Sequence, residues 1–167
     1  MVMGCAGAGK SALARRIAEI TGLRLIHMDP FYYKPNWVVR EAEEVKTLAL
    51  KAIEVDGWVF DGNHSETHEI RAEKSEIIIW VDIPRWRCFY NVFLRFRKFR
   101  GQTRPDMADG CEERVTWGFI KFIWNFNQRS WKIVKLLEDN KHKKQVYRFK
   151  NYAEIDAFVE KMRQTYG

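Results

Sequence analysis

The sequence predicts an α/β fold in which a parallel sheet is covered by helices, and three observations lead to this prediction. Residues 4–11 form a glycine-rich segment that opens directly into a stretch with helical periodicity. Short apolar runs alternate with longer helical stretches, the order that is typical of βαβ units. Residues 77–81 are apolar at every position, as in a strand buried on both faces of a parallel sheet. The length of 167 residues predicts a single domain spanning 1–167.

The glycine-rich segment reads G-x-x-x-x-G-K-S, the pattern of a phosphate-binding P-loop. Its glycines allow the backbone to take positive φ and to approach a ligand closely, so that N–H groups can point at phosphate oxygens. Lys10 would bring a positive charge to the β- and γ-phosphates, and the Ser11 hydroxyl is a ligand for Mg²⁺. The predicted nucleotide-binding residues are Gly4, Cys5, Ala6, Gly7, Ala8, Gly9, Lys10, Ser11 and Ala12.

A helix should follow the P-loop over residues 11–20, because Leu13, Ile17 and Ile20 recur at helical spacing. Thr21 and Gly22 provide its end. The positive end of the helix dipole would then face the bound phosphates. Only three residues precede Gly4, so the first strand is expected to be very short.

Residues 23–28 read as a second strand, which ends in Asp29 and Pro30. Ligands bind at the carboxyl ends of strands in an α/β sheet, so Asp29 is a candidate for chemistry, although Asp-Pro also simply begins turns. Residues 31–37 form an aromatic loop that includes Tyr33 and Trp37. Its rings either anchor the loop to the core or stack on a planar substrate, and the sequence supports both interpretations.

A helix is predicted over residues 39–55, a strand over 57–60 and a short polar helix carrying Arg71 over 65–74. Two predicted strands end in an acid, Asp61 and Asp82. A P-loop enzyme uses one such acid near its Mg²⁺, and both residues are candidates. Either acid could instead cap the helix that follows it.

Pro84 should open the next helix, with an apolar stripe of Phe89, Val92, Phe93, Phe96 and Phe99. Residues 83–105 carry no acid and seven basic side chains: Arg85, Arg87, Arg95, Arg97, Lys98, Arg100 and Arg104. The glycines and proline of residues 101–110 predict a mobile loop. A flexible basic loop fits the lid of a phosphotransferase, and we expect this insert around residues 95–111. Arginines among aromatic residues also fit a nucleic-acid surface.

One long helix is predicted over residues 112–137, with a set of apolar side chains at core spacing: Phe119, Phe122, Ile123, Phe126, Val134 and Leu137. Trp117, Trp124 and Trp131 recur every seven residues, which is more typical of a packing seam than of base stacking. A last strand over 145–149 and a closing helix over 152–166 complete the expected fold.

The net charge of +7 favours an anionic ligand, whether nucleotide, phosphorylated substrate or nucleic acid. Cys5, Cys88 and Cys111 have neither disulfide nor metal spacing, which predicts reduced thiols and a cytoplasmic protein. The four histidines form no predicted ligand set. The longest apolar runs are far shorter than the ~20 residues of a membrane span, so no membrane partner is expected.

The order of these motifs resembles the adenylate-kinase-like P-loop proteins known as DNA topology modulation proteins, over nearly the whole chain. The motifs that carry the resemblance are the P-loop, Asp29-Pro30, residues 33–37, Asp61-Gly62-Asn63, residues 80–85 and residues 101–111. A more distant similarity is to adenylate and shikimate kinases. The resemblance implies a three-layer P-loop fold of the nucleotide kinase type with a five-stranded parallel sheet in the order 2-3-1-4-5.

The resemblance also implies roles for individual residues. It favours Asp61 over Asp82 for the metal, and it puts Asp29 at the acceptor hydroxyl. Arg95, Arg100 and Arg104 match lid arginines, and Arg71 matches an acceptor-side arginine. The acceptor site is accordingly expected to comprise Asp29, Tyr33, Trp37, Asn63 and Arg71.

The chain departs from the family pattern in three places. Family members have several more apolar residues before the P-loop, so the sequence is expected to be truncated or to start at a late methionine. Ala12 replaces a hydroxyl residue that would contact phosphate. Asn63 and His64 replace a Phe-Pro-Arg segment, which argues against AMP as the acceptor.

These observations lead to the expectation of an ATP- and Mg²⁺-dependent kinase that phosphorylates a small molecule, nucleoside or nucleotide. Lys10, Asp29, Arg100 and Arg104 would be its catalytic residues, and Ser11 and Asp61 would hold the metal. The alternative is an ATP-binding regulatory protein associated with DNA, although the sequence has no recognisable DNA-binding module.

Overall fold

The computed structural model describes residues 1–166, without the side chain of Arg129, and its centre is a five-stranded sheet in which every strand pair is parallel. The strands are β1 (Val2–Gly4), β2 (Arg24–His27), β5 (Trp58–Asp61), β6 (Ile77–Val81) and β7 (Gln145–Phe149), and their order is β2-β5-β1-β6-β7. Numbered among themselves, these strands have the order 2-3-1-4-5. The predicted fold class is therefore confirmed.

The short first strand is the middle strand of this sheet. β1 pairs with β6 through Val2, Met3 and Gly4, and with β5 through Val2 opposite Asp61. Met3 is fully buried, as are Ile78 and Val81 on β6. Burial on both faces explains why these strands are almost uniformly apolar.

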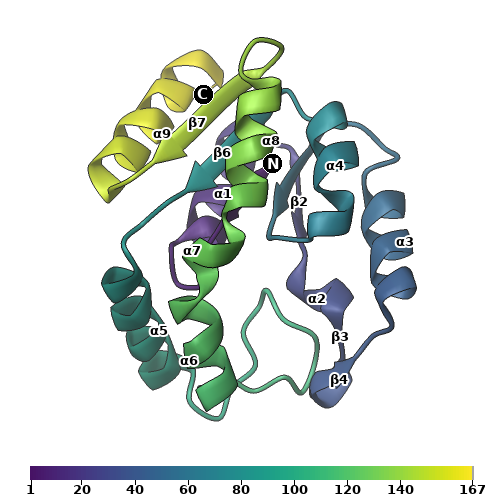
Figure 1. Cartoon of the computed structure of the whole chain (residues 1–167), viewed down its shortest axis with the longest axis vertical. Coiled ribbons are helices and arrows are strands. Elements are labelled where there is room, and N and C mark those ends of the chain that lie inside the picture. The colour runs from purple at the N-terminus through teal and green to yellow at the C-terminus, as the bar shows by residue number, and fades with distance from the viewer. Residues whose placement is uncertain (167) are drawn as a thin grey trace.

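Helices cover both faces of the sheet (Figure 1). Helix α1 (Lys10–Thr21) packs against β1, β2 and β5 and also against α9 (Tyr152–Tyr166). Helix α8 (Trp131–Asn140) packs against β7 and against α4 (His68–Lys74), and both helices cross in front of the sheet in Figure 1. α1 ends at Gly22, whose φ of 69° is the left-handed conformation expected of a helix C-cap glycine.

The segment after β2 contains more structure than the predicted aromatic loop. A short helix, α2 (Asp29–Tyr32), is followed by a two-stranded antiparallel hairpin of β3 (Tyr33–Lys34) and β4 (Val38–Val39), joined by the 3₁₀ turn η1 (Pro35–Trp37). Val39 pairs with Tyr33 in this hairpin, so the predicted start of the next helix at residue 39 is wrong. That helix, α3, spans Ala42–Ala52. A further 3₁₀ turn, η2 (Ser65–Thr67), forms the first part of the predicted helix over residues 65–74.

The prediction of one helix over residues 112–137 is wrong. Helix α5 (Arg85–Phe99) is followed by an irregular segment over residues 100–116, and three separate helices come next: α6 (Trp117–Trp124), α7 (Phe126–Arg129) and α8. Thr116 caps α6 by accepting a hydrogen bond from the N–H of Phe119. The chain bends at Asn125 and Ser130, so that α6 and α7 pass the open end of the sheet before α8 reaches its face (Figure 1).

The prediction that the three regularly spaced tryptophans form a packing seam is also wrong. As whole residues, Trp117, Trp124 and Trp131 are 71%, 61% and 59% exposed. Phe93 on α5 is exposed as well, and Cys88 and Val92 take the buried positions of that helix. Within residues 1–166, no helix is both long and apolar enough to cross a membrane.

Candidate active site

A cavity of about 1090 Å³ opens at the carboxyl ends of β1, β2 and β5. The P-loop forms one wall, and α2 with the hairpin forms another. α6, α7 and the irregular segment 100–116 close the remaining sides. Strand ends that meet at one edge of a parallel sheet bring together side chains from distant parts of the sequence, which is the usual position of a ligand site in this class of fold.

The P-loop is held by side chains from two other parts of the chain. The Asn63 amide donates to the Gly4 carbonyl at 2.6 Å and accepts from the Gly4 N–H at 3.1 Å. Asn91 donates to the Gly7 carbonyl at 2.7 Å and to the Tyr152 hydroxyl at 2.6 Å. A Cβ at Gly7 would lie 2.4 Å from the Cys88 carbonyl oxygen, so only glycine fits there. Gly7 and Gly9 both have positive φ, the backbone geometry that forms anion-binding concavities.

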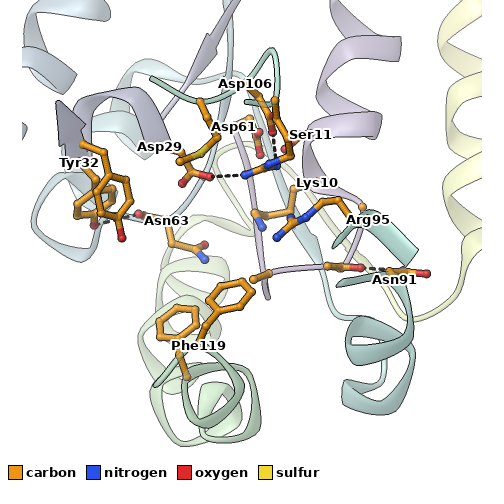
Figure 2. A pocket seen from close by; sticks show the side chains of 18 of the residues that line it. Lys10, Ser11, Asp29, Tyr32, Asp61, Asn63, Asn91, Arg95, Asp106 and Phe119 are labelled. Atoms are coloured by element: carbon orange, nitrogen blue, oxygen red, sulfur yellow. Dashed lines mark hydrogen bonds and ion pairs between the residues drawn. The ribbon is translucent and has the colours of Figure 1, made fainter. Parts of the chain in front are cut away.

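Lys10 and Ser11 lie at the start of α1 and line the cavity. Lys10 Nζ donates to the Cys5 carbonyl at 2.9 Å, which holds its charge across the mouth of the loop (Figure 2). Ala6, Gly7, Gly9 and Ala12 line the cavity with them. The predicted residues Gly4, Cys5 and Ala8 are instead buried on the core side of the loop and do not line the cavity.

Asp61, the last residue of β5, lies close to both Lys10 and Ser11 (Figure 2). Its Oδ2 accepts a hydrogen bond from His27 Nδ1 at 2.9 Å, whereas its buried Oδ1 has no hydrogen-bond partner among the described residues. Burial alone would raise the pKa of Asp61, but the His27 hydrogen bond, the Lys10 charge and the neighbouring Ser11 hydroxyl outweigh it and hold the pKa below its usual value. An ionised carboxylate with one free oxygen beside a serine hydroxyl is a suitable donor set for Mg²⁺.

Asp82 occupies a different environment. It accepts hydrogen bonds from Arg148 Nε at 2.9 Å and Nη2 at 2.7 Å, and it is not among the residues that line the cavity. Of the two strand-end acids, only Asp61 therefore faces the P-loop lysine.

Asp29 lies across the cavity from the P-loop, at the start of α2 (Figure 2). Its side chain is 53% exposed toward the open cavity. The surrounding protein raises the pKa of Asp29 by desolvating its charge, Lys10 and Arg104 oppose this rise, and the nearby Asp61 and Asp106 add to it. A partly desolvated carboxylate that faces a phosphate site has the properties of a general base.

Arg104 and Arg95 form a charged cluster with three acids, which we call the Glu113 cluster: Asp29, Arg95, Arg104, Asp106 and Glu113. Arg104 lies 2.8 Å from Asp106, 2.7 Å from Glu113 and 3.8 Å from Asp29. The other oxygen of Glu113 accepts a hydrogen bond from Arg95 Nε at 2.8 Å. Burial and the neighbouring Arg104 charge lower the pKa of Arg95, and Glu113 opposes that shift.

The other predicted site residues divide into two groups. Tyr33, Trp37 and Asn63 line the cavity. Arg100 and Arg71 do not line it: Arg100 is exposed, and Arg71 is fully buried, where it donates to the carbonyls of Gly62 and His64. Arg71 also lies over the Phe60 ring, so it supports the loop after β5 from the protein interior.

The sequence prediction missed Glu113, Asp106 and Asn91 as lining residues. Asp106 and Glu113 are among the first acids after the acid-free stretch of residues 83–105. This change from basic to acidic side chains is the feature of the sequence that could have identified them. Phe119, Phe122 and Phe126 were predicted as core residues, but all three also face the cavity.

Comparisons with known proteins establish the fold and no closer relationship. No family model matches the sequence, and no curated protein matches it. Among solved structures, the chain is similar to shikimate kinase from Acinetobacter baumannii in complex with shikimate, with a TM-score of 0.63 and 12% identity over 98% of this chain and 89% of that one. It is also similar to deoxyadenosine kinase from M. mycoides with bound dCTP, with a TM-score of 0.52 and 12% identity over 98% of this chain and 100% of that one. The chain therefore has the fold of P-loop kinases.

Proposed function

We propose that the protein is an ATP- and Mg²⁺-dependent phosphotransferase that moves the γ-phosphoryl group to a hydroxyl of a small-molecule, nucleoside or nucleotide acceptor. One observation carries the proposal: Lys10, Ser11 and Asp61 face Asp29 across a single cavity at the ends of three parallel strands. The likeness of the fold to shikimate kinase and deoxyadenosine kinase supports the same reaction class.

Each of these side chains has a defined role in the proposed reaction. The P-loop amides and Lys10 bind the phosphates, and the helix dipole of α1 adds to their attraction. Ser11 and the free oxygen of Asp61 would hold Mg²⁺, which when bound neutralises charge on the β- and γ-phosphates. Asp29 orients the acceptor hydroxyl and accepts its proton.

Arg104 and Arg95 would stabilise charge on the transferring phosphoryl group. Both line the cavity, and arginines in this role are worth about 10³–10⁵ in rate. Arg100, the other predicted catalytic arginine, is exposed outside the cavity, so its part in catalysis requires movement of the segment 100–116. Such closure of a lid is common among phosphotransferases.

The test is ADP release from ATP and Mg²⁺ across a panel of nucleosides, nucleoside monophosphates and small hydroxylated metabolites. Lys10→Ala serves as the control variant, and we expect it to lose turnover while it keeps the wild-type circular dichroism spectrum. ATP turnover that persists in folded Lys10→Ala would refute the assignment.

A second candidate function is that of an ATP-binding protein associated with DNA, as the resemblance to DNA topology modulation proteins suggests. The observation in its favour is the exposed face of α5, where Trp86, Tyr90 and Phe93 alternate with stacked arginines: Arg87 lies over Trp86 and Tyr90, and Arg97 over Phe93. Exposed rings beside arginines are suited to bases and phosphates. Duplex and single-stranded DNA affinity measured against salt tests this candidate, because each phosphate contact lowers log K by about 0.7–0.9 per decade of salt.

We further infer a cytoplasmic protein, because Cys5, Cys88 and Cys111 are all free thiols in the described structure. Their buried positions give them the character of core residues.

A further inference from the structure

Two residues with a strained backbone lie in η1, the turn at the tip of the hairpin. Asn36 has a φ of 61° and Trp37 a φ of 62°, and within residues 1–166 no other residue besides glycine has a positive φ. Asparagine tolerates this left-handed conformation, but for a bulky residue such as tryptophan it is an outlier. Such a conformation persists only where surrounding contacts hold it, and it occurs mostly at ligand clamps and switch regions. The contacts of η1 should therefore indicate what this conformation is for.

Three N–H groups of η1 donate hydrogen bonds to the irregular segment 100–116. The Asn36 N–H donates to the Asp109 carbonyl at 3.1 Å. Trp37 donates twice, from its backbone N–H to Cys111 Sγ at 3.2 Å and from Nε1 to the Glu112 carbonyl at 3.1 Å. The Cys111 thiol in turn donates to the Lys34 carbonyl at 3.6 Å. We call these contacts the Trp37 latch, and its residues are Lys34, Asn36, Trp37, Asp109, Cys111 and Glu112.

Side chains pack closely around the Trp37 latch. The Trp37 ring lies edge-on to Tyr33, with ring centroids 4.9 Å apart, and the Arg114 guanidinium lies 4.4 Å from the centre of the same ring. Cys111 is only 1% exposed, so the latch shields its thiol from solvent. In Figure 1 the segment 100–116 runs between α6 and the hairpin of β3 and β4. The latch therefore joins two walls of the cavity.

The Trp37 latch lies next to the groups that the proposed reaction uses. On one side, Glu112 directly precedes Glu113, whose carboxylate holds both Arg95 and Arg104. On the other side, the hairpin continues directly from α2, which begins with Asp29. Arg104 Nη2 lies 3.8 Å from Asp29 Oδ2. This distance depends on how the hairpin and the segment 100–116 are placed relative to each other.

A small change in that placement would affect the reaction strongly. The segment 100–116 is irregular, so its position depends on contacts such as those of the latch. A reacting group that is misplaced by about 1 Å costs up to about a hundredfold in rate, even when the substitution is far from the chemistry. The P-loop is held by Asn63 and Asn91, which are not part of the latch. Loss of the latch should therefore affect transfer and not the binding of ATP.

We propose that Trp37 and Cys111 are positioning residues, which hold Arg104 opposite Asp29 and thereby set the rate of phosphoryl transfer. The inference rests on the proposed function. It also explains two sequence motifs, residues 33–37 and residues 101–111, as the two halves of one contact.

Two variants break the latch at different atoms. Trp37→Phe keeps an aromatic ring at the cavity wall but removes the Nε1 donor to Glu112, and Cys111→Ala removes the sulfur that accepts from the Trp37 N–H. For both we expect kcat to fall tenfold or more. The Kd of a non-hydrolysable ATP analogue with Mg²⁺, measured by calorimetry, should stay within about threefold of wild type. Urea unfolding confirms that each variant is folded under the assay conditions.

Matched variants control for the chemical changes. Cys111→Ser provides a hydroxyl that donates and accepts as the thiol does, and it should restore kcat to within about threefold of wild type. Trp117→Phe makes the same ring substitution at a residue that is 71% exposed and outside the cavity, and it should leave kcat unchanged. A wild-type kcat in folded Trp37→Phe and Cys111→Ala would overturn the proposal. A fall in kcat matched by an equal loss of affinity for the ATP analogue would overturn it too, because the effect would then be general.

A second measurement is independent of turnover. Iodoacetamide should alkylate the shielded Cys111 thiol slowly in the wild type and tenfold or more faster in Trp37→Phe. Peptide mass spectrometry separates Cys111 from Cys5 and Cys88, which are also buried. Trp117→Phe should keep the wild-type rate. An unchanged rate at Cys111 in Trp37→Phe would show that the indole hydrogen bond does not hold the two segments together.

The outcomes also separate this inference from the proposed function. Wild-type protein that transfers phosphate to no acceptor, but shows the expected alkylation rates, would refute the phosphotransferase and the positioning role while the latch itself stood. Normal transfer in the wild type and in both latch variants would refute the positioning role and leave the phosphotransferase intact.

Discussion

Asp29 is the residue on which the proposed reaction depends most directly, and its environment predicts how activity should vary with pH. A general base acts only when it is deprotonated, and desolvation by the surrounding protein raises the pKa of this carboxyl above its ordinary value. As the pH falls, turnover should therefore be lost at a higher pH than an ordinary aspartate would give.

Asp29→Asn should lower kcat by about 10²–10⁴ and remove this acidic limb of the pH–rate profile. Steady-state rates between pH 4 and pH 8 provide the measurement. Asp82→Asn is the matched control, because Asp82 also follows a strand of the sheet but is paired with Arg148 outside the cavity. Full activity in Asp29→Asn would exclude the residue as the base.

His68 predicts a second pH effect, this time on stability. Burial, followed by the charge of Arg71, lowers the pKa of His68 to about 3, whereas an unfolded histidine titrates near 6.5. The unfolded chain therefore takes up a proton that the folded protein resists, so the contribution of His68 is complete above about pH 6.5 and falls as the pH drops toward 3. At pH 5 the loss amounts to about 2 kcal/mol.

His68→Gln should reduce the difference in unfolding free energy between pH 7 and pH 5, because glutamine can still accept the hydrogen bond from the His64 N–H without titrating. Urea unfolding at the two pH values measures it, and His142→Gln changes an exposed histidine as the control. The neighbouring His64, whose pKa is also lowered, will retain part of the pH dependence. An identical pH dependence in wild type and His68→Gln would show that His68 carries no such penalty.

At the scale of elements, the connection between β1 and the loop after β5 depends strongly on one side chain. β1 is only three residues long, and Asn63 adds two hydrogen bonds to its last residue, Gly4. Each such bond contributes about 0.5–1.5 kcal/mol, so Asn63→Ala should lower the unfolding free energy by about 1–3 kcal/mol. The midpoint of urea unfolding is the measurement. Asn127→Ala, at an exposed position on α7, should change the midpoint little.

The sequence could predict most elements because their apolar patterns are local. The run at residues 77–81 and the closing helix with Ile155, Phe158, Val159 and Met162 buried both agree with the structure. The bends at Asn125 and Ser130 were not predictable in this way. Ile123, Phe126 and Ile133 lie on three separate helices, yet all three are buried. The apolar spacing in the sequence therefore continues across the bends and does not reveal them.

The candidate site was predictable to the extent that it depends on motifs and strand ends. Lys10 and Ser11 belong to a contiguous pattern, and Asp29 and Asp61 follow from the rule that strand ends meet at one edge of the sheet. Glu113 belongs to no local pattern, because its place in the site depends on two arginines that contact it only in the folded chain. Arg71 shows the opposite case. Its match to the family pattern predicted a place in the acceptor site, but the folded chain buries its side chain, which donates to the Gly62 carbonyl.

At the scale of the whole molecule, we propose that residues 1–167 unfold as one domain. The buried side chains of β1, β6, α1 and α9 belong to one continuous core, and α8 packs onto the same sheet. Far-ultraviolet circular dichroism and tryptophan fluorescence should therefore report the same urea midpoint. Two separated transitions would contradict a single cooperative unit.

The two hydrogen bonds between Asn63 and Gly4 have a consequence for cooperativity. They join the P-loop to the loop that carries Asn63 into the acceptor end of the cavity, so neither loop can shift without displacing the other. If ligands occupy both ends, their binding free energies are then linked, and such linkage is reciprocal. A nucleotide that tightens acceptor binding by a given factor must itself be bound more tightly by that same factor when the acceptor is present.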